Sequence, residues 1–434
     1  MAVTGRLGAL ALLAALGVGL LAPEGSAGWL VLVVTGTLGL LVLVALALAA
    51  PVRTLQVRRD GDAAVRLGEP ATVRVAVVNP GRRRLRGRLR DAWPPSAGAA
   101  TQRHRVDVPP GEQRRVVTHL RPSRRGDRYA GPVTIRALGP LGLAARQGSH
   151  HAPWRLRALP PFTSRKHLPS RLARLRELDG RSAVHVRGQG TEFDSLREYV
   201  VGDDVRSIDW RASARAADVM VRTWRPERDR RVLLVLDCGR TTAGRVGDAP
   251  RIDAAMDAAL LLAALASRAG DRVDLLSYYR GVRARVEGVA APALLPALVQ
   301  AMAPVEASLV ELDYRGLVGT VTSGTSRRSL VVLLTALDAA PVEEGLVPVL
   351  GQLTKRHQVV LASVADPRVA SMAAGRGSLD AVYEAASAAR TQAERRQVAD
   401  LLRRRRVEVV DAAPDRLAPA LADRYLDLKA AGRL

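Results

Sequence analysis

Two apolar runs open the chain, and they constrain its fold more than any other feature. Leu7 to Leu21 contains no charged residue, and Trp29 to Ala50 adds about 22 residues, mainly Leu, Val, Gly and Ala. At about 1.5 Å of rise per helical residue, the second run is long enough to cross the hydrocarbon core of a bilayer, and the first is short but adequate. We therefore predict a transmembrane hairpin over residues 1–52, with spans at about 7–22 and 29–50.

A secretory signal peptide is the alternative, with Arg6 as its basic start and the first apolar run as its hydrophobic segment. The hairpin is favoured because a second apolar run follows at once and no clear A-x-A cleavage site precedes it. Arg6 lies before the first run, Arg53 follows the second, and the turn between them carries only Glu24. The positive-inside rule then predicts a multi-pass protein of the cell membrane whose soluble body is cytoplasmic.

Residues 53–160 follow an apolar–polar alternation with a period of two. Ala71 to Gly81 is one example, a strand that ends in an Asn-Pro-Gly turn. Recurring turn signals and the absence of a helical period predict a small β-sandwich-like domain. This segment has about 23 arginines and about seven acidic residues between Arg53 and Arg157. Two readings stay open: attraction to anionic lipid head groups, or arginines on the solvent faces of strands.

The formal net charge of +24 raises a further alternative, a basic membrane protein that binds nucleic acid. Aromatic side chains, which stack on bases, make up only 3% of the chain. Trp93, Tyr129 and Trp154 are scattered through the β-rich segment and form no obvious platform. We therefore expect no nucleic-acid partner.

Residues 231–434 alternate between apolar runs and helical periods. Arg231 to Asp237 is a continuous apolar run of the kind found in strands buried on both faces, and Ser329 to Asp338 is a second. This alternation predicts an α/β domain with a doubly wound parallel sheet. Neither G-x-G-x-x-G nor G-x-x-x-x-G-K-[ST] is present, which argues against a nucleotide-binding Rossmann or P-loop domain.

Polar side chains follow two of the predicted strands, where ligands bind in open α/β sheets. The first loop begins with Asp237 and resembles the D-x-S-x-S loop of von Willebrand factor A domains, in which oxygen ligands hold Mg²⁺ with a coordination position left for a partner's carboxylate. By this resemblance, the candidate metal ligands are Asp237, Thr241, Thr335 and Asp338. Mg²⁺ is the one cofactor that they suggest.

The match is partial. Gly239 stands where the first serine is expected, and Ala336 stands at the position of the later aspartate. The alternative is a vestigial site, in which Asp237 caps the next turn or pairs with Arg240 or Arg215.

No catalytic residue is predicted. Cys238 is the only cysteine, so no intramolecular disulfide can form. No histidine is placed by any pattern to act as its base, and a small semi-buried residue is the favoured reading. A metal-dependent enzyme with its site at the Asp237 strand end remains the alternative function.

The connector, residues 161–230, contains an unusual stretch of acidic, basic and aromatic residues, GTEFDSLREYVVGDDVRSIDWRASARAADVMVR. It resembles the signature of the domain of unknown function 58 family. The matching residues are Gly190, Glu192, Phe193, Arg197, Tyr199, Gly202, Asp203, Asp204, Arg206, Ile208, Asp209, Trp210, Ser213, Ala214 and Arg215.

The resemblance implies a membrane-anchored protein with a von Willebrand factor A-like domain that works with a MoxR-type AAA+ ATPase to assemble or activate other proteins. We therefore expect a protein-interaction adaptor. From the residues alone, we expect the aspartates to pair with Arg206, Arg211 and Arg215 and to fasten the connector onto the α/β domain, with Trp210 packed against the sheet. The alternative is that this stretch presents a surface to a partner.

Overall fold

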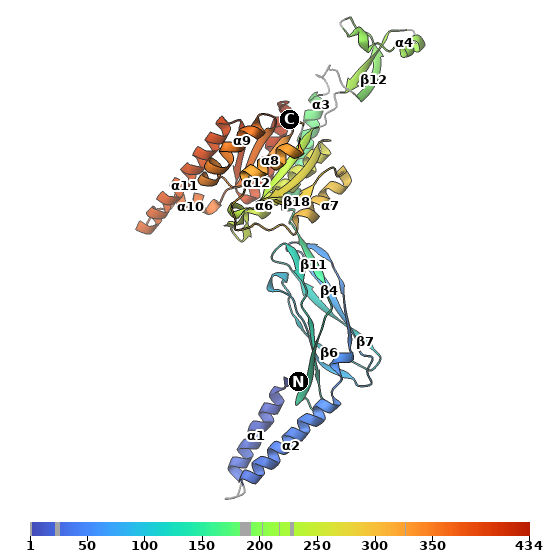
Figure 1. The fold of residues 1–434 in the computed structure, drawn as a ribbon, viewed down its shortest axis with the longest axis vertical. Coiled ribbons are helices and arrows are strands. Elements are labelled where there is room, and N and C mark those ends of the chain that lie inside the picture. Colours follow the sequence, from blue (N-terminus) through green and yellow to red (C-terminus); the bar gives the residue numbers. More distant parts are fainter. Residues whose placement is uncertain are drawn as a thin grey trace. The chain divides into compact units, whose positions relative to one another are not determined.

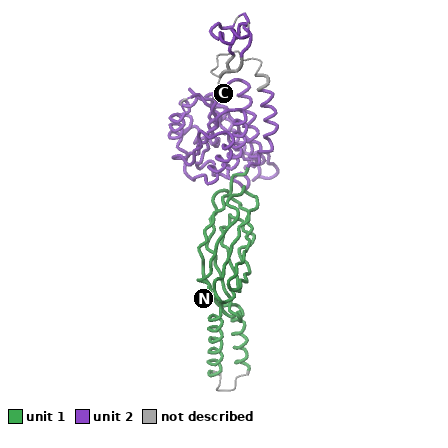
Figure 2. The backbone as a smooth tube through the Cα atoms, turned by 90° about the vertical axis from the view of Figure 1, so that its right-hand side faces the viewer, with its two compact units in different colours: residues 1–161 green, residues 162–434 purple. Residues whose placement is uncertain are grey.

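The computed structural model describes residues 2–21, 27–182, 192–201, 203–216, 218–225, 230–325 and 327–434. The chain forms two compact units, Met1–Pro161 and Phe162–Leu434 (Figure 2). Each unit has its own hydrophobic core, and each is described by itself.

The first unit begins with two apolar helices, α1 (Gly5–Leu21) and α2 (Ala27–Leu48) (Figure 1). Of the described helices, only the one that includes α2 is long and apolar enough to cross a membrane, with a mean hydropathy of 2.7 over its most apolar window. The 17 residues of α1 lie at the lower limit of the length of a span, and the predicted pair of spans is not confirmed. Near the end of α2, Ala45 and Leu46 pack against Ala144.

The rest of the first unit consists of β-strands in three sheets, with strand orders β1-β10-β9-β5-β6, β2-β4-β7 and β3-β11-β8. Val75 and Val77 of β4 pack in one core with Leu85 and Leu89 of β5, so the first two sheets share buried apolar side chains. The strands are β1 (Ala2–Val3), β2 (Gln56–Gly61), β3 (Ala64–Arg66), β4 (Ala71–Val78), β5 (Leu85–Asp91), β6 (Arg103–Val108), β7 (Gln113–Leu120), β8 (Gly126–Tyr129), β9 (Val133–Leu138), β10 (Ala144–His150) and β11 (Arg155–Leu159).

The second unit is built around a six-stranded sheet of order β18-β17-β14-β19-β20-β21. All neighbouring strands are parallel except β18, which is antiparallel to β17. Numbered along the chain the order is 3-2-1-4-5-6, which is that of doubly wound sheets. The strands are β14 (Arg231–Asp237), β17 (Arg272–Tyr278), β18 (Val282–Val286), β19 (Leu330–Leu334), β20 (Gln358–Val364) and β21 (Val407–Ala412).

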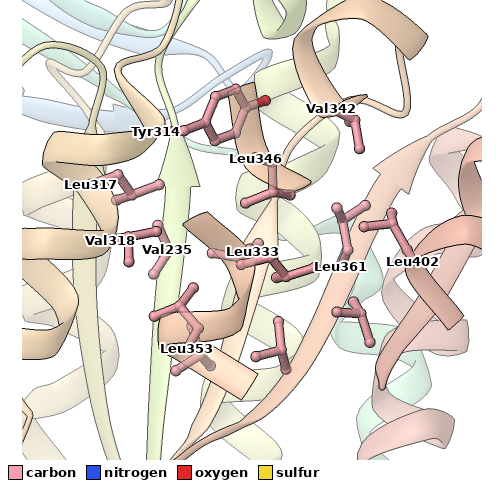
Figure 3. Packing of buried hydrophobic residues seen from close by; sticks show 14 of the residues in the cluster. Val235, Tyr314, Leu317, Val318, Leu333, Val342, Leu346, Leu353, Leu361 and Leu402 are labelled. Atoms are coloured by element: carbon pink, nitrogen blue, oxygen red, sulfur yellow. The ribbon is translucent and has the colours of Figure 1, made fainter. Parts of the chain in front are cut away.

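Helices cover both faces of this sheet. One face is covered by α8, the π-helical turn Pro341–Leu346 and α9. Their side chains pack against strand residues such as Leu333, and they include Tyr314, Leu317, Leu346 and Leu353 (Figure 3). The other face is covered by α6 and α12, which contact the sheet and each other. The helices are α5 (Arg240–Ala243), α6 (Arg251–Arg268), α7 (Ala291–Met302), α8 (Tyr314–Gly324), α9 (Val347–Thr354), α10 (Pro367–Ala373), α11 (Leu379–Arg404) and α12 (Pro414–Ala430).

Most of these elements match the sequence prediction. The edge strand β18 and the helix α8 were not predicted: β18 has alternating arginines and no apolar run, and the apolar face of α8 spans only Tyr314 to Val321. The helical segment that follows β19 begins with a wider π-helical turn, Pro341–Leu346, and continues as the regular α9.

The start of the connector is fastened to the second unit by polar contacts. It forms a helical turn, η3 (Thr163–His167), and a helix, α3 (Leu168–Ser182). The buried carboxylate of Asp257 accepts hydrogen bonds from the Ser164 backbone amide and hydroxyl and from the Thr163 hydroxyl. Arg171 of α3 forms an ion pair with Asp423 of α12 at 2.9 Å.

Candidate functional site

The carboxyl ends of β14 and β19 meet at the point where the strand order reverses. Asp237 is the last residue of β14, and Thr335 directly follows β19. The two strands are paired in parallel, so their ends lie at the same edge of the sheet. This edge is where open α/β sheets bind their ligands.

The side chain of Asp237 accepts hydrogen bonds from three residues at this edge of the sheet. Its Oδ1 accepts a hydrogen bond from the Gly239 amide at 2.6 Å, and its Oδ2 accepts from the hydroxyls of Thr335 at 2.5 Å and Thr241 at 3.2 Å. The residue is only 2% exposed. Burial raises the pKa of Asp237, and the three donors oppose that rise. Three of the four predicted ligands, Asp237, Thr241 and Thr335, are therefore in direct contact.

The loop after β14 is packed tightly against a neighbouring loop. A Cβ atom on Gly239 would lie 3.0 Å from Asp237 Oδ1 and 3.1 Å from the backbone nitrogen of Leu312. The Arg240 amide also donates to the Val310 carbonyl at 2.9 Å. A serine at position 239 would need these neighbours to move apart, so the loop is packed around a glycine where the D-x-S-x-S pattern has a serine.

Cys238 is fully buried, and its Sγ lies 3.5 Å from the Leu236 carbonyl oxygen. Buried thiols of this kind behave as small apolar groups. Its position agrees with a packing role.

Asp338 faces basic side chains and lies outside the hydrogen-bond cluster of Asp237. Its carboxylate is 3.8 Å from Arg251 and 3.8 Å from Arg395. Arg395 also binds Asp411 at 2.7 Å and the Ser363 hydroxyl at 3.0 Å, so one guanidinium links β20, β21 and Asp338.

These residues do not fit a magnesium ion. The described part of the chain contains no group of three or more His, Cys, Asp or Glu side chains that could hold a metal. Two lone pairs of Asp237 Oδ2 already accept hydroxyl hydrogen bonds, and Asp338 is directed to two guanidinium groups. The hydrogen bond from Gly239 instead matches the alternative in which Asp237 caps the next turn.

A groove of about 420 Å³ lies beside this cluster. Its walls carry charges of both signs, and Val369 and Ala370 add apolar surface. Arg251 Nε lies in this wall, is buried and has no hydrogen-bond partner among the described residues. The charged residues that line the groove are Arg251, Asp338, Asp366, Arg395, Arg396, Arg403 and Asp411.

The signature residues form a separate hairpin. Strands β12 (Glu192–Glu198) and β13 (Met220–Arg225) pair antiparallel, and a turn, η4 (Val205–Ser207), and a short helix, α4 (Trp210–Ala216), lie between them. The Tyr199 amide donates to the Val219 carbonyl at 2.7 Å and continues the pairing. Gly190 and Gly202 lie outside the described residues, as do the side chains of Glu192 and Phe193.

The aspartates of the signature form hydrogen bonds and ion pairs with other residues of the same hairpin. Asp203 pairs with Arg197 at 2.6 Å and also accepts from the Val200 amide. Asp204 caps η4 by accepting from the Arg206 amide at 3.0 Å. The aspartates were expected to pair with the side chains of Arg206, Arg211 and Arg215. The ion pair described for Asp203 is instead with Arg197.

Asp209 holds the second half of the hairpin together. Its Oδ1 accepts from the amides of Arg211 and Ala212, and its Oδ2 accepts from Arg222 Nε at 2.7 Å. The Ala212 amide and Arg222 lower the pKa of Asp209. Ser213 donates to the Asp209 carbonyl and accepts from the Met220 amide, both at 2.8 Å.

Trp210 is 70% exposed, so the prediction that it packs against the sheet is not confirmed. The hydrogen bonds described for Asp203, Asp204 and Asp209 also stay within the hairpin, whereas the connector is joined to the α/β body through Ser164 and Arg171.

Sequence reasoning missed several residues of the strand-end site. Arg395 lies in the middle of α11, far along the chain from Asp237, and no local motif marks it. Tyr314 begins α8 and is hydrogen-bonded to Thr335, and burial raises the pKa of its hydroxyl. Only the topology of the sheet brings these side chains together.

Comparison with known structures finds likenesses to parts of the chain. The CARDB domain of a Pyrococcus furiosus protein, crystallised with di-metal ions, is 15% identical, with a TM-score of 0.18, and the match covers 24% of this chain and 86% of that domain. A beta-glucosidase from Listeria innocua is 12% identical, with a TM-score of 0.15, and the match covers 23% of this chain and 16% of the enzyme. No curated protein matches the chain.

The family comparison addresses the signature and the α/β sheet together. The family described as "Protein of unknown function DUF58" matches residues 195–408, from within β12 to the second residue of β21. This range contains the described signature residues from Arg197 onward and all four strand-end residues, Asp237, Thr241, Thr335 and Asp338. The match supports the assignment of this chain to the DUF58 family.

Proposed function

We propose that this chain is a membrane-anchored adaptor that binds a protein partner at the strand-end groove of its α/β unit. The anchor is α2, whose apolar side chains are exposed along its length, as with Leu40 at 61% and Leu43 at 64%. A helix that is apolar all round and exposed needs an apolar environment such as a bilayer.

The observation that carries the proposal is the chemistry of the groove lined by Asp338 and Arg395. Guanidinium and carboxylate groups line it together with small apolar side chains. Arg396 and Thr391 of α11 are exposed at its wall. Such a mixture suits the side chains of a polypeptide, because arginine pairs with carboxylates in fixed geometry and the apolar patch accepts an aliphatic group. The described strand-end residues contain no nucleophile paired with a base, so an enzyme is not proposed.

The family resemblance supplies the class of partner, a MoxR-type AAA+ ATPase, and the role, assembly or activation of other proteins. The sheet order with an antiparallel edge strand is consistent with a von Willebrand factor A-like domain, which we include in the proposal. In this proposal, the hydrogen bonds of Asp237 have a structural role. They hold the ends of β14 and β19 together and so fix the loop after β19, from which Asp338 faces Arg395 of α11.

Crosslinking in native membranes, followed by mass spectrometry of the co-purified proteins, tests the proposal. We expect the wild-type chain to recover a AAA+ ATPase and Arg396→Glu, in the groove, to lose it. Arg390→Glu reverses the same charge on the same helix, but Arg390 does not line the groove, so recovery should persist. Equal recovery by both variants would remove the groove from the proposal. Absence of an ATPase from the wild-type sample would overturn the partner class.

A further inference from the structure

A second hollow, of about 790 Å³, lies at the opposite edge of the sheet, where β20 and β21 begin. Six of its lining residues are basic: Arg328, Lys355, Arg356, Arg403, Arg406 and Arg433. Glu408 is the one acidic residue in the lining. The volume is within the range of about 300–1,000 Å³ that is typical of small-ligand sites.

The positive charge of this hollow is only partly neutralised. Arg403 pairs with Asp400 and Arg433 with Glu408, both at 2.8 Å. Lys355, Arg356 and Arg406 have no ion-pair partner among the described residues. Like charges held this close repel one another, and a concave surface concentrates their field, so the hollow attracts an anion.

Two lining residues also carry buried polar atoms that lack a partner. His357 is 5% exposed, and neither of its ring nitrogens has a hydrogen-bond partner in the described part of the chain. Gln358 Nε2 is also buried and has no hydrogen-bond partner among the described residues. Buried polar groups in folded proteins are nearly always satisfied, so unsatisfied donors on the wall of a cavity point to a missing acceptor.

The backbone at Arg406 is a third, independent sign. Its φ of 65° is in the left-handed region, and it is the one non-glycine residue with a positive φ among those described. Glycine would fit this turn between α11 and β21 without strain. A strained position occupied by a long basic side chain suggests that the side chain itself is used.

From these observations, we propose that the hollow binds a phosphate-bearing ligand of about the size of pyrophosphate. A phosphate offers several acceptor oxygens, which match the forked donors of arginine and the donors of His357 and Gln358. The lining contains no Phe, Tyr or Trp on which a nucleobase could stack, so the phosphate itself is the group that is recognised. Burial, and after it the charge of Arg356, lower the pKa of His357, which favours the neutral imidazole when no anion is bound.

Titration calorimetry of the full chain in detergent with inorganic pyrophosphate, at constant ionic strength, tests this site. We expect Arg406→Gly and His357→Leu each to weaken binding by about tenfold or more, as for the loss of one charge-assisted contact. Arg416→Ala removes an exposed arginine beyond the opposite end of β21 and serves as the matched control, with unchanged affinity.

Stability separates binding from folding in these variants. Arg406→Gly relieves a strained φ, and His357→Leu removes two unsatisfied nitrogens, so neither variant should melt below the wild type. Equal pyrophosphate affinity in all four proteins, or no binding by the wild type, would overturn the proposal. Binding of a polyglutamate peptide with the same dependence on Arg406, while pyrophosphate fails to bind, would also overturn it.

The source of the phosphate can be distinguished with nanodiscs. The full chain is placed in phosphatidylcholine discs with or without phosphatidic acid, and pyrophosphate is titrated into each. If the natural ligand is a lipid head group, phosphatidic acid should weaken pyrophosphate binding in the wild type and not in Arg406→Gly. If the ligand is free in solution, the two kinds of disc should give the same affinity.

Discussion

At the scale of single residues, Asp237 shows how a resemblance in sequence can differ in chemistry. The carboxylate lies where a metal ligand is expected, but its oxygens accept hydrogen bonds from one amide and two hydroxyls. The same side chains that could bind an ion are used to close the loop on itself. Asp237 therefore stabilises the loop through its hydrogen bonds, although burial of its negative charge costs free energy.

Stability should depend on pH through this residue. The folded pKa of Asp237 is raised above its ordinary value of 3.8, so the folded chain binds the proton more tightly than the unfolded chain does. The stabilisation is full below pH 3.8 and is lost as the pH rises through the folded pKa. We expect Asp237→Asn to reduce this loss, as measured by chemical unfolding of the full chain in detergent at about pH 5 and about pH 8.

Asp237→Ala is the matched comparison for this prediction. It removes the acceptor of three donors, and we expect it to lower the free energy of unfolding by about 1–3 kcal/mol at either pH. Burial raises the pKa of Asp271 as well, so part of the pH dependence should remain in both variants. An unchanged slope in Asp237→Asn, together with stabilisation of the wild type by Mg²⁺, would favour an ion site instead.

At this scale, the sequence predicted part of the site. The D-x-G-x-T loop and the later threonine could be found because parallel strand ends meet at one edge. Arg395 and Tyr314 could not be found, because they lie on helices and reach Asp338 and Thr335 only through the packing of those helices against the sheet. The partners of the signature aspartates were missed for a similar reason: Arg222 reaches Asp209 only because β13 returns beside β12.

At the scale of elements, the β-strands of the first unit are joined by a buried ion pair. Arg59 of β2 and Asp91 of β5 have fully buried side chains that meet at 2.6 Å, across two different sheets. Asp91 also accepts from Trp93 Nε1 and from the Thr118 hydroxyl, both at 2.8 Å. A buried pair with this many partners gives strand pairing a fixed geometry, and removal of one member leaves an unpaired charge.

We expect Asp91→Ala to lower the free energy of unfolding of the first unit by about 3–5 kcal/mol, because it leaves the Arg59 guanidinium buried and unpaired. Hydrogen-exchange mass spectrometry of the full chain should show faster exchange in β2, β5 and β7. Asp107→Ala breaks an exposed pair with Arg84 and should leave exchange in these strands unchanged. Equal protection in both variants would show that the buried pair does not stabilise the strands.

The buried strands were the easiest elements to predict. Continuous apolar runs such as β14 and β19 leave few alternatives, and the helices between them carry clear periods. The edge strand β18 was missed because alternate arginines, Arg283 and Arg285, give it no apolar run. The charges of the connector serve two segments, which the sequence did not separate: Arg171 pairs with Asp423 of α12, and Asp209 pairs within the hairpin.

At the scale of the whole molecule, the apolar N-terminus was predicted as two spans, and one helix has the length and apolarity of a span. Composition alone could not decide this, because α1 and α2 are equally free of acidic residues and differ mainly in length. The number of spans sets whether the two ends of the chain lie on the same side of the membrane.

Double substitutions to arginine in α1 or α2 can test which of the two helices spans the membrane. Leu40→Arg with Leu43→Arg places two charges in α2, at a cost of about 2.5–3.5 kcal/mol each near the centre of a span. We expect this variant to be released from membranes by alkaline carbonate. Leu13→Arg with Leu16→Arg makes the same change in α1, where the side chains are similarly exposed, at 65% and 54%. Retention of this second variant supports α2 as the anchor. Release of both variants would restore the two-span hairpin, and retention of both would contradict the assignment of α2 as the sole anchor.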